Sequence, residues 1–239
     1  MASCVSGALL MNDPVLLKPI DAVVFDCDGT LSKIEGITDL AEMNDVGEVV
    51  AKLTEEAMAT TGISPELYAK RLNMIHPSKK QIALMADHYY QERVMGVESL
   101  LACLLQLNKV IYVVSAGIAE AVKAFAARLQ ITEANVFAVE VYFDAAGDYK
   151  DFDHDSLLIQ NCGKRQVVNE LLQQYPRIVY VGDGQNDLCC LDIVTRFIGF
   201  GGVSYRDSIK NACDFYVTSE DISSILPLIL THEELSLHC

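Results

Sequence analysis

Short apolar runs recur along the chain and alternate with longer stretches in which apolar residues repeat every three or four positions. Such runs are typical of buried strands, whereas the longer spacing is typical of helices. The alternation predicts an α/β fold, a Rossmann-like doubly wound parallel sheet covered by helices on both faces. A stretch rich in Asp, Gly and aromatic residues, 142–155, is predicted to form a hairpin or loop extending from the sheet. The predicted strands lie near 22–26, 110–114, 135–140, 178–182, 197–200 and 214–217.

The interval between the first two predicted strands breaks this rhythm. Residues 31–107 are far more than an ordinary strand-to-helix connection needs. Apolar residues within this interval keep helical spacing over several stretches. We therefore expect residues 33–92 to form a small helical cap inserted after the first strand. Residues 1–32 and 93–239 are then expected to form the core.

Composition limits the kind of protein this can be. The chain has 239 residues, 51% hydrophobic and 21% charged, which is enough for one good core and a smaller lobe. A formal net charge of −15 argues against nucleic acid or an anionic membrane as partner. No apolar run approaches the roughly 20 residues of a membrane helix, and the first twenty residues lack the basic start of a secretory signal. We expect a soluble, cytoplasmic protein.

The eight cysteines show no paired spacing of the kind that binds a metal, and the five histidines are scattered. Reduced thiols, several of them buried, are therefore expected. The cysteines are Cys4, Cys27, Cys103, Cys162, Cys189, Cys190, Cys213 and Cys239.

Two acidic residues follow the first predicted strand. Asp26 and Asp28 are two apart, so in extended chain both carboxylates can face one cleft while Cys27 points aside. A carboxylate is ionised at neutral pH and can attack phosphorus without a base, which makes Asp26 the predicted nucleophile. Asp28 is placed to protonate a leaving alkoxide and then to take a proton from the hydrolytic water.

Phosphate-binding groups are predicted at the ends of other strands. The second strand ends at Ser115, and Ala116 and Gly117 then open a helical pattern whose free N–H groups could hold phosphate oxygens together with the Ser115 hydroxyl. Lys164 begins another helix and could neutralise charge on the transferring group. Taken singly, Ser115 fits a helix cap and Lys164 a solvated lysine.

The segment Gly-Asp-Gly-Gln-Asn-Asp follows the fourth predicted strand. An anionic nucleophile can approach a phosphate dianion only if a hard cation lies between them, and Mg²⁺ accepts carboxylate and phosphate oxygens. Asp183 is predicted to join Asp26 at this ion, with Asp187 binding or orienting the ligands and Asn186 reaching phosphate or substrate. By itself, the segment also fits an ordinary turn or a calcium-type loop.

These four segments, in this order across separate strand–helix units, resemble the haloacid dehalogenase superfamily of phosphatases. Within it the chain is most similar to the phosphoserine phosphatases, over roughly residues 20–220. The resemblance implies the same fold, Mg²⁺ as cofactor, an aspartyl-phosphate on Asp26, and the backbone carbonyl of Asp28 as an additional metal ligand.

The resemblance also extends to substrate recognition. Glu35 and Arg71 match cap positions at which phosphoserine phosphatases recognise the amino and carboxylate groups of their substrate. An acid suits an ammonium group and an arginine fork suits a carboxylate. Without the resemblance, each would be interpreted as a solvated surface charge.

Three positions depart from the family pattern. Ser64 stands where the family commonly has a phenylalanine that shields the pocket, although Ile63 or Tyr68 could take that role after a local shift. Ala116 adds a methyl group to a turn that usually carries glycine, and Gly29 stands where serine is frequent. The first two departures could change the pocket, and none touches the chemical step.

The leading hypothesis is a Mg²⁺-dependent phosphomonoesterase that acts on O-phospho-L-serine or a similar small phosphorylated amine. One alternative is a phosphotransferase that passes the aspartyl-phosphate to an acceptor alcohol. Another is a phosphatase for a different small ester, such as phosphocholine, phosphoethanolamine or a nucleotide. A non-catalytic phosphate sensor is disfavoured by the intact acidic residues and lysine. The sequence leaves the oligomeric state open.

Overall fold

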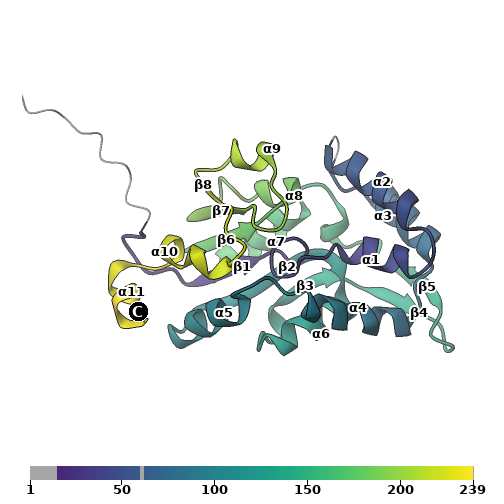
Figure 1. Cartoon of the computed structure of the whole chain (residues 1–239), viewed down its shortest axis with the longest axis horizontal. Coiled ribbons are helices and arrows are strands. Elements are labelled where there is room, and N and C mark those ends of the chain that lie inside the picture. Colours follow the sequence, from purple (N-terminus) through teal and green to yellow (C-terminus); the bar gives the residue numbers. More distant parts are fainter. Residues whose placement is uncertain (1–14, 60–61, 239) are drawn as a thin grey trace, which may run out of the picture.

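The computed structural model describes residues 15–59 and 62–238. Six parallel strands form the central sheet in the order β3-β2-β1-β6-β7-β8, with helices on both faces (Figure 1). All six predicted strands are present, and the predicted α/β class is confirmed. Their bounds are β1 Ala22–Phe25, β2 Val110–Ile118, β3 Val136–Val139, β6 Ile178–Gly182, β7 Arg196–Phe200 and β8 Phe215–Val217.

The register of the sheet places three strand ends side by side. β1 pairs in parallel with β2 through Phe25 and Val113, and with β6 through Phe25 and Val181. Every residue of β1 and β6 is buried, as expected for strands covered on both faces. Because ligands in such sheets bind beyond the carboxyl ends of the strands, the residues after β1, β2 and β6 are brought to one edge.

The core helices follow the strands in sequence. β2 is longer than predicted, and the next helix begins at Ala119 rather than at Ala116. The predicted helix start at Ala116 is wrong because the chain stays extended through Ile118. The core helices are α5 Val97–Gln106, α6 Ala119–Arg128, α7 Gly163–Leu172, α8 Gln185–Leu188, α9 Asp207–Lys210, α10 Leu226–Ile229 and α11 His232–His238, with 3-10 turns at Glu133–Asn135, Leu157–Ile159 and Ile222–Ile225.

The long interval after β1 is helical, as expected from its spacing. It contains α1 Gly36–Glu42, α2 Gly47–Ala59, α3 Pro65–Ile75 and α4 Lys79–Gln91, which gather at one end of the molecule (Figure 1). α4 also packs along α6 of the core, where the Tyr89 ring stacks on Phe125 with centroids 5.5 Å apart. The division into a cap of residues 33–92 and a core stays a prediction.

The hairpin predicted within 142–155 is present as β4 Val141–Phe143 and β5 Tyr149–Phe152. It reaches from the core to the inserted helices. The Phe152 ring lies 5.3 Å from that of Tyr68 on α3, and the Lys79 N–H at the start of α4 donates to the Gly147 carbonyl. The hairpin therefore contacts both α3 and α4.

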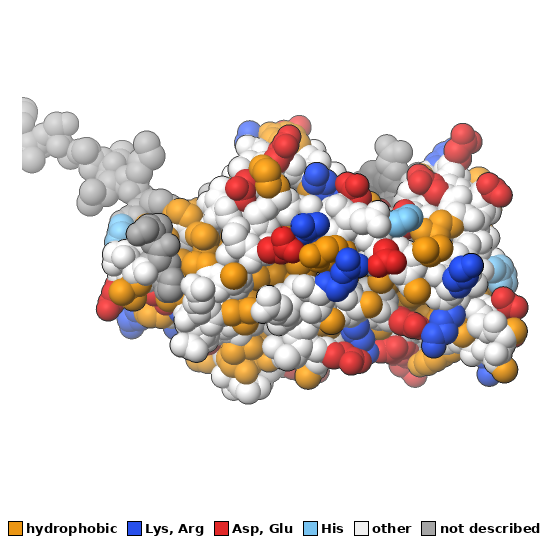
Figure 2. All heavy atoms as spheres, turned by 60° about the horizontal axis from the view of Figure 1, so that its bottom comes forward, with side chains coloured by type: hydrophobic (Ala, Val, Ile, Leu, Met, Phe, Trp, Pro, Cys, Tyr) orange, Lys and Arg blue, Asp and Glu red, His pale blue; other side chains and the backbone are white. Residues whose placement is uncertain are grey.

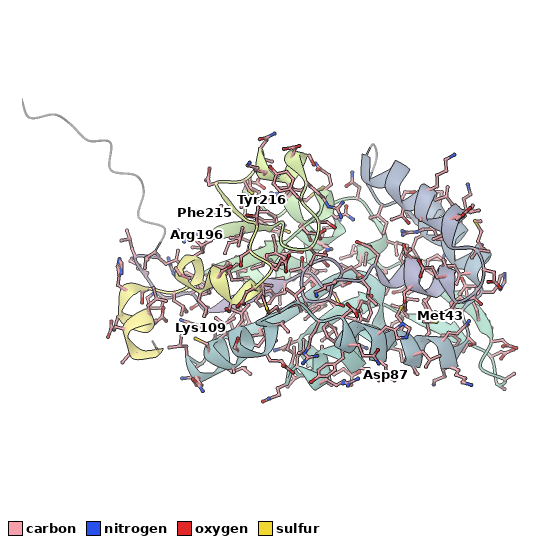
Figure 3. All side chains as sticks on the ribbon, in the orientation of Figure 1. Met43, Asp87, Lys109, Arg196, Phe215 and Tyr216 are labelled. Carbon is pink, nitrogen blue, oxygen red and sulfur yellow. A yellow bond between two sulfur atoms is a disulfide. The ribbon has the colours of Figure 1, made fainter. Side chains whose placement is uncertain are left out.

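The opposite end of the sheet is closed by charged and aromatic contacts. Lys109, labelled in Figure 3, donates to the Ile20 carbonyl and pairs with Glu234 of α11. The Arg196 guanidinium lies over the ring of Phe215, 4.1 Å from its centroid, and the two are neighbours in Figure 3. The first contact holds α11 against the core, and the second joins the beginnings of β7 and β8.

The surface shows no segregation of charge on the face drawn in Figure 2, where lysines and arginines lie among aspartates and glutamates. Within residues 15–59 and 62–238, none of the helices has the length and apolar character needed to cross a membrane.

Candidate active site

A cavity of about 110 Å³ lies between the carboxyl edge of the sheet and the inserted helices. That volume is several times the roughly 10–15 Å³ that one water molecule needs, so it suits a small ligand. Nine of the ten site residues predicted from the sequence line it: Asp26, Asp28, Glu35, Arg71, Ala116, Lys164, Asp183, Asn186 and Asp187. The tenth, Ser115, lies just behind its wall.

Asp26 takes its position from the sheet. Its N–H donates to the Val181 carbonyl at 3.0 Å, which continues the pairing of β1 with β6 by one residue. The carboxylate accepts the Cys27 N–H at 2.7 Å and is only 7% exposed. Cys27 itself is fully buried in the core, as its place between the two acids predicted.

Lys164 links two of the acids. Its Nζ lies 2.7 Å from Asp26 Oδ1 and 2.7 Å from Asp187 Oδ1. Asp187 also accepts the Tyr180 hydroxyl at 2.7 Å and the Gly184 N–H at 2.9 Å. Burial opposes the charge on Lys164, but the two carboxylates outweigh it and raise the pKa of the ammonium group. Lys164 is therefore a permanent cation fixed beside Asp26.

Three carboxylates converge beside this lysine. Asp26, Asp183 and Asp187 each offer an oxygen within 4.8 Å of the others, and all three are buried. Asp183 also pairs with Arg206, with Oδ2 and Nη2 3.0 Å apart. Oxygen-only ligands in this number suit a hard divalent cation such as Mg²⁺. The donor set fits the metal that the sequence predicted, whereas the carboxylate of Asp28 points elsewhere.

The electrostatics of the cluster agree with that fit. Burial, reinforced by the nearby Asp187 carboxylate, raises the pKa of Asp26 well above its ordinary value. The same two causes raise the pKa of Asp183 to about 7. The protein alone therefore leaves more negative charge here than Lys164 and Arg206 neutralise, and a divalent cation would relieve the excess.

Two glycines are needed for the acids to pack so closely. A Cβ on Gly182 would lie 2.4 Å from Cγ of Asp187. Gly29 has a φ of +69°, and a Cβ there would lie 2.6 Å from Oδ2 of Asp183. Glycine tolerates both the positive φ and the contact, which explains the glycine in each acidic segment.

Asp28 faces the inserted helices. Its Oδ1 accepts the Gly36 N–H at 2.6 Å and the Tyr89 hydroxyl at 2.8 Å. Its Oδ2 accepts the Ser115 hydroxyl at 3.3 Å. The second acid is thus held by the start of α1, by α4 and by β2, so its orientation depends on both the core and the insertion.

The segment after Val114 lines the cavity without being helical. The Gly117 N–H donates to the Ser115 hydroxyl oxygen at 2.9 Å, which folds Ala116 and Gly117 into the cavity wall. A Cβ on Gly117 would lie 3.3 Å from Oδ2 of Asp28. The helix start predicted at Ala116 is therefore absent, since α6 begins only at Ala119.

Glu35 and Arg71 reach the same cavity from the inserted helices. Arg71 is 7% exposed, and its Nη1 donates to the Thr54 hydroxyl at 3.3 Å. Enclosure in the cavity raises the pKa of Glu35 to about 8, with the Asp28 and Asp183 carboxylates adding to the effect. Both residues lie in the cavity and not on a solvated surface.

The departure at Ser64 has a local explanation. Its hydroxyl accepts the Leu67 N–H at 3.2 Å and caps the start of α3, with Pro65 at the first helical position. Ile63 and Tyr68, the two residues suggested as replacements for the family phenylalanine, both line the cavity. Ser64 thus caps α3, and Ile63 and Tyr68 line the cavity in place of the family phenylalanine.

Several residues of the site carried no signal in the sequence. Tyr89 and Tyr180 looked like apolar helix and strand positions, yet their hydroxyls donate to Asp28 and Asp187. Arg206 comes from a loop far along the chain, and Thr54 from a helix interior. Only the tertiary fold brings these four side chains to the site.

The prediction that the cysteines are reduced thiols is wrong for one pair. Cys162 and Cys189 form a disulfide across 27 residues. Cys162 precedes α7, which carries Lys164, and Cys189 follows α8, which carries Asp187. Scattered spacing could not predict this pair because only the fold brings it together. Cys27, Cys103, Cys190 and Cys213 are free, while Cys4 and Cys239 lie outside the described residues.

Comparison with known proteins connects this sequence and fold to one family of hydrolases. A family model for haloacid dehalogenase-like hydrolases matches residues 23–192. The phosphoserine phosphatase of Bos taurus is 32% identical over 200 residues, which cover 83% of this chain and 89% of that protein. The phosphoserine phosphatase of Homo sapiens is 30% identical over 205 residues, covering 85% and 91%.

Solved structures agree on the fold. A phosphoserine phosphohydrolase-like protein from Francisella tularensis superimposes with a TM-score of 0.77 at 22% identity, covering 87% of this chain and 100% of that chain. The extent of the family match and the identity to the curated relatives decide the assignment. This chain belongs to the haloacid dehalogenase-like hydrolase family, among its phosphoserine phosphatase-like members.

Proposed function

We propose that this protein is a Mg²⁺-dependent phosphomonoesterase that works through an aspartyl-phosphate on Asp26. The observation that carries the proposal is the placement of a buried carboxylate in a small cavity, with one cation 2.7 Å away and two further carboxylates within 4.8 Å. A carboxylate nucleophile, a cation for the transferred group and a site for a divalent ion are the parts that phosphoryl transfer needs.

In the first half-reaction, an Asp26 oxygen attacks phosphorus and the bond from phosphorus to the substrate oxygen breaks. The leaving oxygen takes a proton from Asp28, and the alcohol departs. Lys164 lies where it neutralises charge that builds on the phosphoryl oxygens. When bound by Asp26, Asp183 and the Asp28 carbonyl, Mg²⁺ would supply the positive charge that lets two anions approach. Asp187, held by Lys164 and Tyr180, orients the cluster.

In the second half-reaction, Asp28 takes a proton from water, and the water oxygen attacks the phosphorus of the aspartyl-phosphate. The bond to Asp26 breaks, which releases inorganic phosphate and regenerates both acids. The inserted helices cover the cavity, and we propose that they exclude bulk water during transfer and open for product release. The contacts from Gly36 and Tyr89 to Asp28 would couple that closure to the acid.

Removing the Tyr89 hydroxyl tests the role of Asp28. We expect Tyr89→Phe to keep the ring stacked on Phe125 but to lower kcat about tenfold for esters with alkoxide leaving groups, because Asp28 loses one of its positioning donors. For p-nitrophenyl phosphate, whose leaving group needs no proton, kcat should change less. Steady-state kinetics on both esters measure the difference, and an equal loss on both would contradict this role.

For the substrate, we propose O-phospho-L-serine or a similar small phosphorylated amine. Glu35 and Arg71 line the end of the cavity contributed by the inserted helices and match an ammonium and a carboxylate group. The curated relatives are named as phosphoserine phosphatases, which supports the same choice. The cytoplasmic location expected from the sequence stays a prediction.

Substitutions in this part of the cavity should affect binding more than chemistry. We expect Glu35→Gln and Arg71→Ala each to raise KM for O-phosphoserine about 10- to 100-fold with little change in kcat, because each loses a charged hydrogen bond away from phosphorus. Lys70→Ala is the matched control, since Lys70 adjoins Arg71 on α3 but is exposed. A fall in kcat with unchanged KM would show that these residues serve the chemical step.

The proposed function is tested by a phosphate-release screen with Mg²⁺ over phosphorylated amino acids, phosphoethanolamine, phosphocholine, nucleotides and sugar phosphates. Release from O-phosphoserine at the highest kcat/KM is expected. Product analysis in the presence of acceptor alcohols separates hydrolysis from phosphotransfer. Absence of release from every ester would overturn the proposal.

A further inference from the structure

One wall of the cavity carries two buried polar atoms that no described residue satisfies. The Tyr68 hydroxyl and the Arg71 Nε have no hydrogen-bond partner among the residues that the structure describes. Tyr68 is 2% exposed and Arg71 7%, and both line the cavity. Buried polar groups normally have partners, so two neighbouring exceptions at a cavity wall indicate a missing ligand.

The two residues act as a unit because of their spacing. They are three apart on α3, so their side chains lie on the same face of the helix. The Arg71 guanidinium lies 5.7 Å from the centroid of the Tyr68 ring. The ring is also fixed from the other side by Phe152 of the hairpin, with centroids 5.3 Å apart. Tyr68 is thus held in place by packing that does not involve its hydroxyl.

Both atoms present hydrogens to a ligand. A guanidinium Nε can only donate, and a hydroxyl beside a positive guanidinium turns its lone pairs toward that charge and its hydrogen away. Burial raises the pKa of Tyr68 above its ordinary value, so the hydroxyl stays protonated. The missing group must therefore accept hydrogen bonds from both.

The positive charge of Arg71 determines which kind of acceptor can bind there. Among the described residues, no carboxylate lies within ion-pair distance of Arg71, although Glu35 lines the same cavity and its charge acts on the guanidinium. Its Nη1 is bonded to the neutral Thr54 hydroxyl. A buried guanidinium without a counter-ion is unfavourable unless an anion completes it. An anionic acceptor with two oxygens, a carboxylate, meets both requirements.

We propose that Tyr68 is a specificity-determining residue whose hydroxyl joins Arg71 Nε in binding the carboxylate of the substrate. This inference rests on the proposed function and adds to it. Tyr68 selects between substrates and takes no part in the transfer of phosphate.

The test compares two esters that differ by one group. O-Phosphoserine and phosphoethanolamine share the phosphate, the ester oxygen and the amine, and only the first has a carboxylate. Tyr68→Phe keeps the ring and its packing on Phe152 and removes only the hydroxyl. We expect kcat/KM for O-phosphoserine to fall about 10- to 100-fold through KM, while kcat/KM for phosphoethanolamine changes less than twofold.

Tyr142→Phe is the matched control, because Tyr142 lies on β4 with 48% of its surface exposed. It should leave both substrates unaffected. Equal losses on the two esters with Tyr68→Phe, or no loss on either, would overturn the inference and leave the phosphatase standing. Preference of the unaltered enzyme for phosphoethanolamine would do the same. Failure of the unaltered enzyme to release phosphate from either ester would overturn the proposed function and this inference with it.

Discussion

Replacing Asp26 with asparagine is expected to abolish phosphate release while leaving the fold intact. The amide has nearly the same shape as the carboxylate, so it can still accept the Cys27 N–H and the Lys164 ammonium. An amide oxygen is a poor nucleophile toward phosphorus, and no covalent intermediate can form. Loss of a nucleophile that works with its neighbours as a unit lowers the rate by roughly 10⁴-fold or more.

The same substitution should not destabilise the metal-free protein. Burial and Asp187 raise the pKa of Asp26, which means that its ionised form is held in the folded state at a cost in free energy. A neutral amide removes that cost, so the unfolding midpoint without Mg²⁺ should equal or exceed that of the unaltered protein. Thermal unfolding followed by circular dichroism measures it.

An exposed acid supplies the control. Asp155→Asn removes one negative charge from an exposed position and should keep full activity. Mass spectrometry after a rapid acid quench should detect an added phosphate on the unaltered enzyme and none on Asp26→Asn. Turnover retained in Asp26→Asn would show that another group attacks phosphorus, and the mechanism would be wrong.

The sequence predicted the sheet because its strands are buried on both faces. Continuous apolar runs such as 178–182 are typical of such strands, and each predicted strand is present in the sheet. The acids were predictable for a related reason, since each follows such a run directly. Parallel pairing then forces Asp26 and Asp183 to the same edge, whatever the rest of the chain does.

What the sequence could not predict depends on contacts across long separations. The helix expected from Ala116 fails because the Ser115 hydroxyl holds the Gly117 N–H and keeps the chain extended to Ile118. The helical spacing of apolar residues is satisfied by the positions after Ile118, so it does not define where the helix begins. The disulfide of Cys162 with Cys189 was missed for a similar reason: it joins the segments of two helices that approach each other only in the folded core.

The polar contacts of the buried tyrosines could not be predicted from the sequence either. Tyr89 and Tyr180 occupy positions where an apolar residue fits the helix or strand pattern, and the pattern gives no weight to a hydroxyl. Each hydroxyl nevertheless donates to an acid of the cluster, at 2.8 Å to Asp28 and 2.7 Å to Asp187. Such residues position the acids and are found only when the geometry is known.

Magnesium is expected to raise the unfolding midpoint, and to raise it more at pH 8 than at pH 5.5. Burial and Asp187 raise the pKa of Asp183 to about 7 in the metal-free protein. Between the ordinary carboxyl pKa of about 4 and this value, the folded protein holds a proton that the unfolded chain has released. The stability of the metal-free protein therefore falls as pH rises through this window and levels off above it.

The cation and the proton compete for the same oxygens. The affinity for Mg²⁺ therefore rises over the same pH range in which the stability of the metal-free protein falls. At a concentration about 100 times Kd, binding to the folded state adds about 2.7 kcal/mol, which corresponds to a rise of roughly 5–11 °C for a chain of this size. Thermal unfolding with Mg²⁺ or with a chelator, at both pH values, measures the difference.

Asp183→Asn separates binding at this cluster from a general effect of salt. The neutral amide is a weaker ligand for a hard cation and no longer titrates, so the variant should lose most of the Mg²⁺-dependent rise and most of its pH dependence. Its metal-free form should be more stable than the unaltered protein at pH 8, because a buried, repelled charge is gone. Asp155→Asn should retain the full response to Mg²⁺. If Asp183→Asn responded to Mg²⁺ as strongly as the unaltered protein, the ion would bind elsewhere, and the three carboxylates would need another explanation for their convergence.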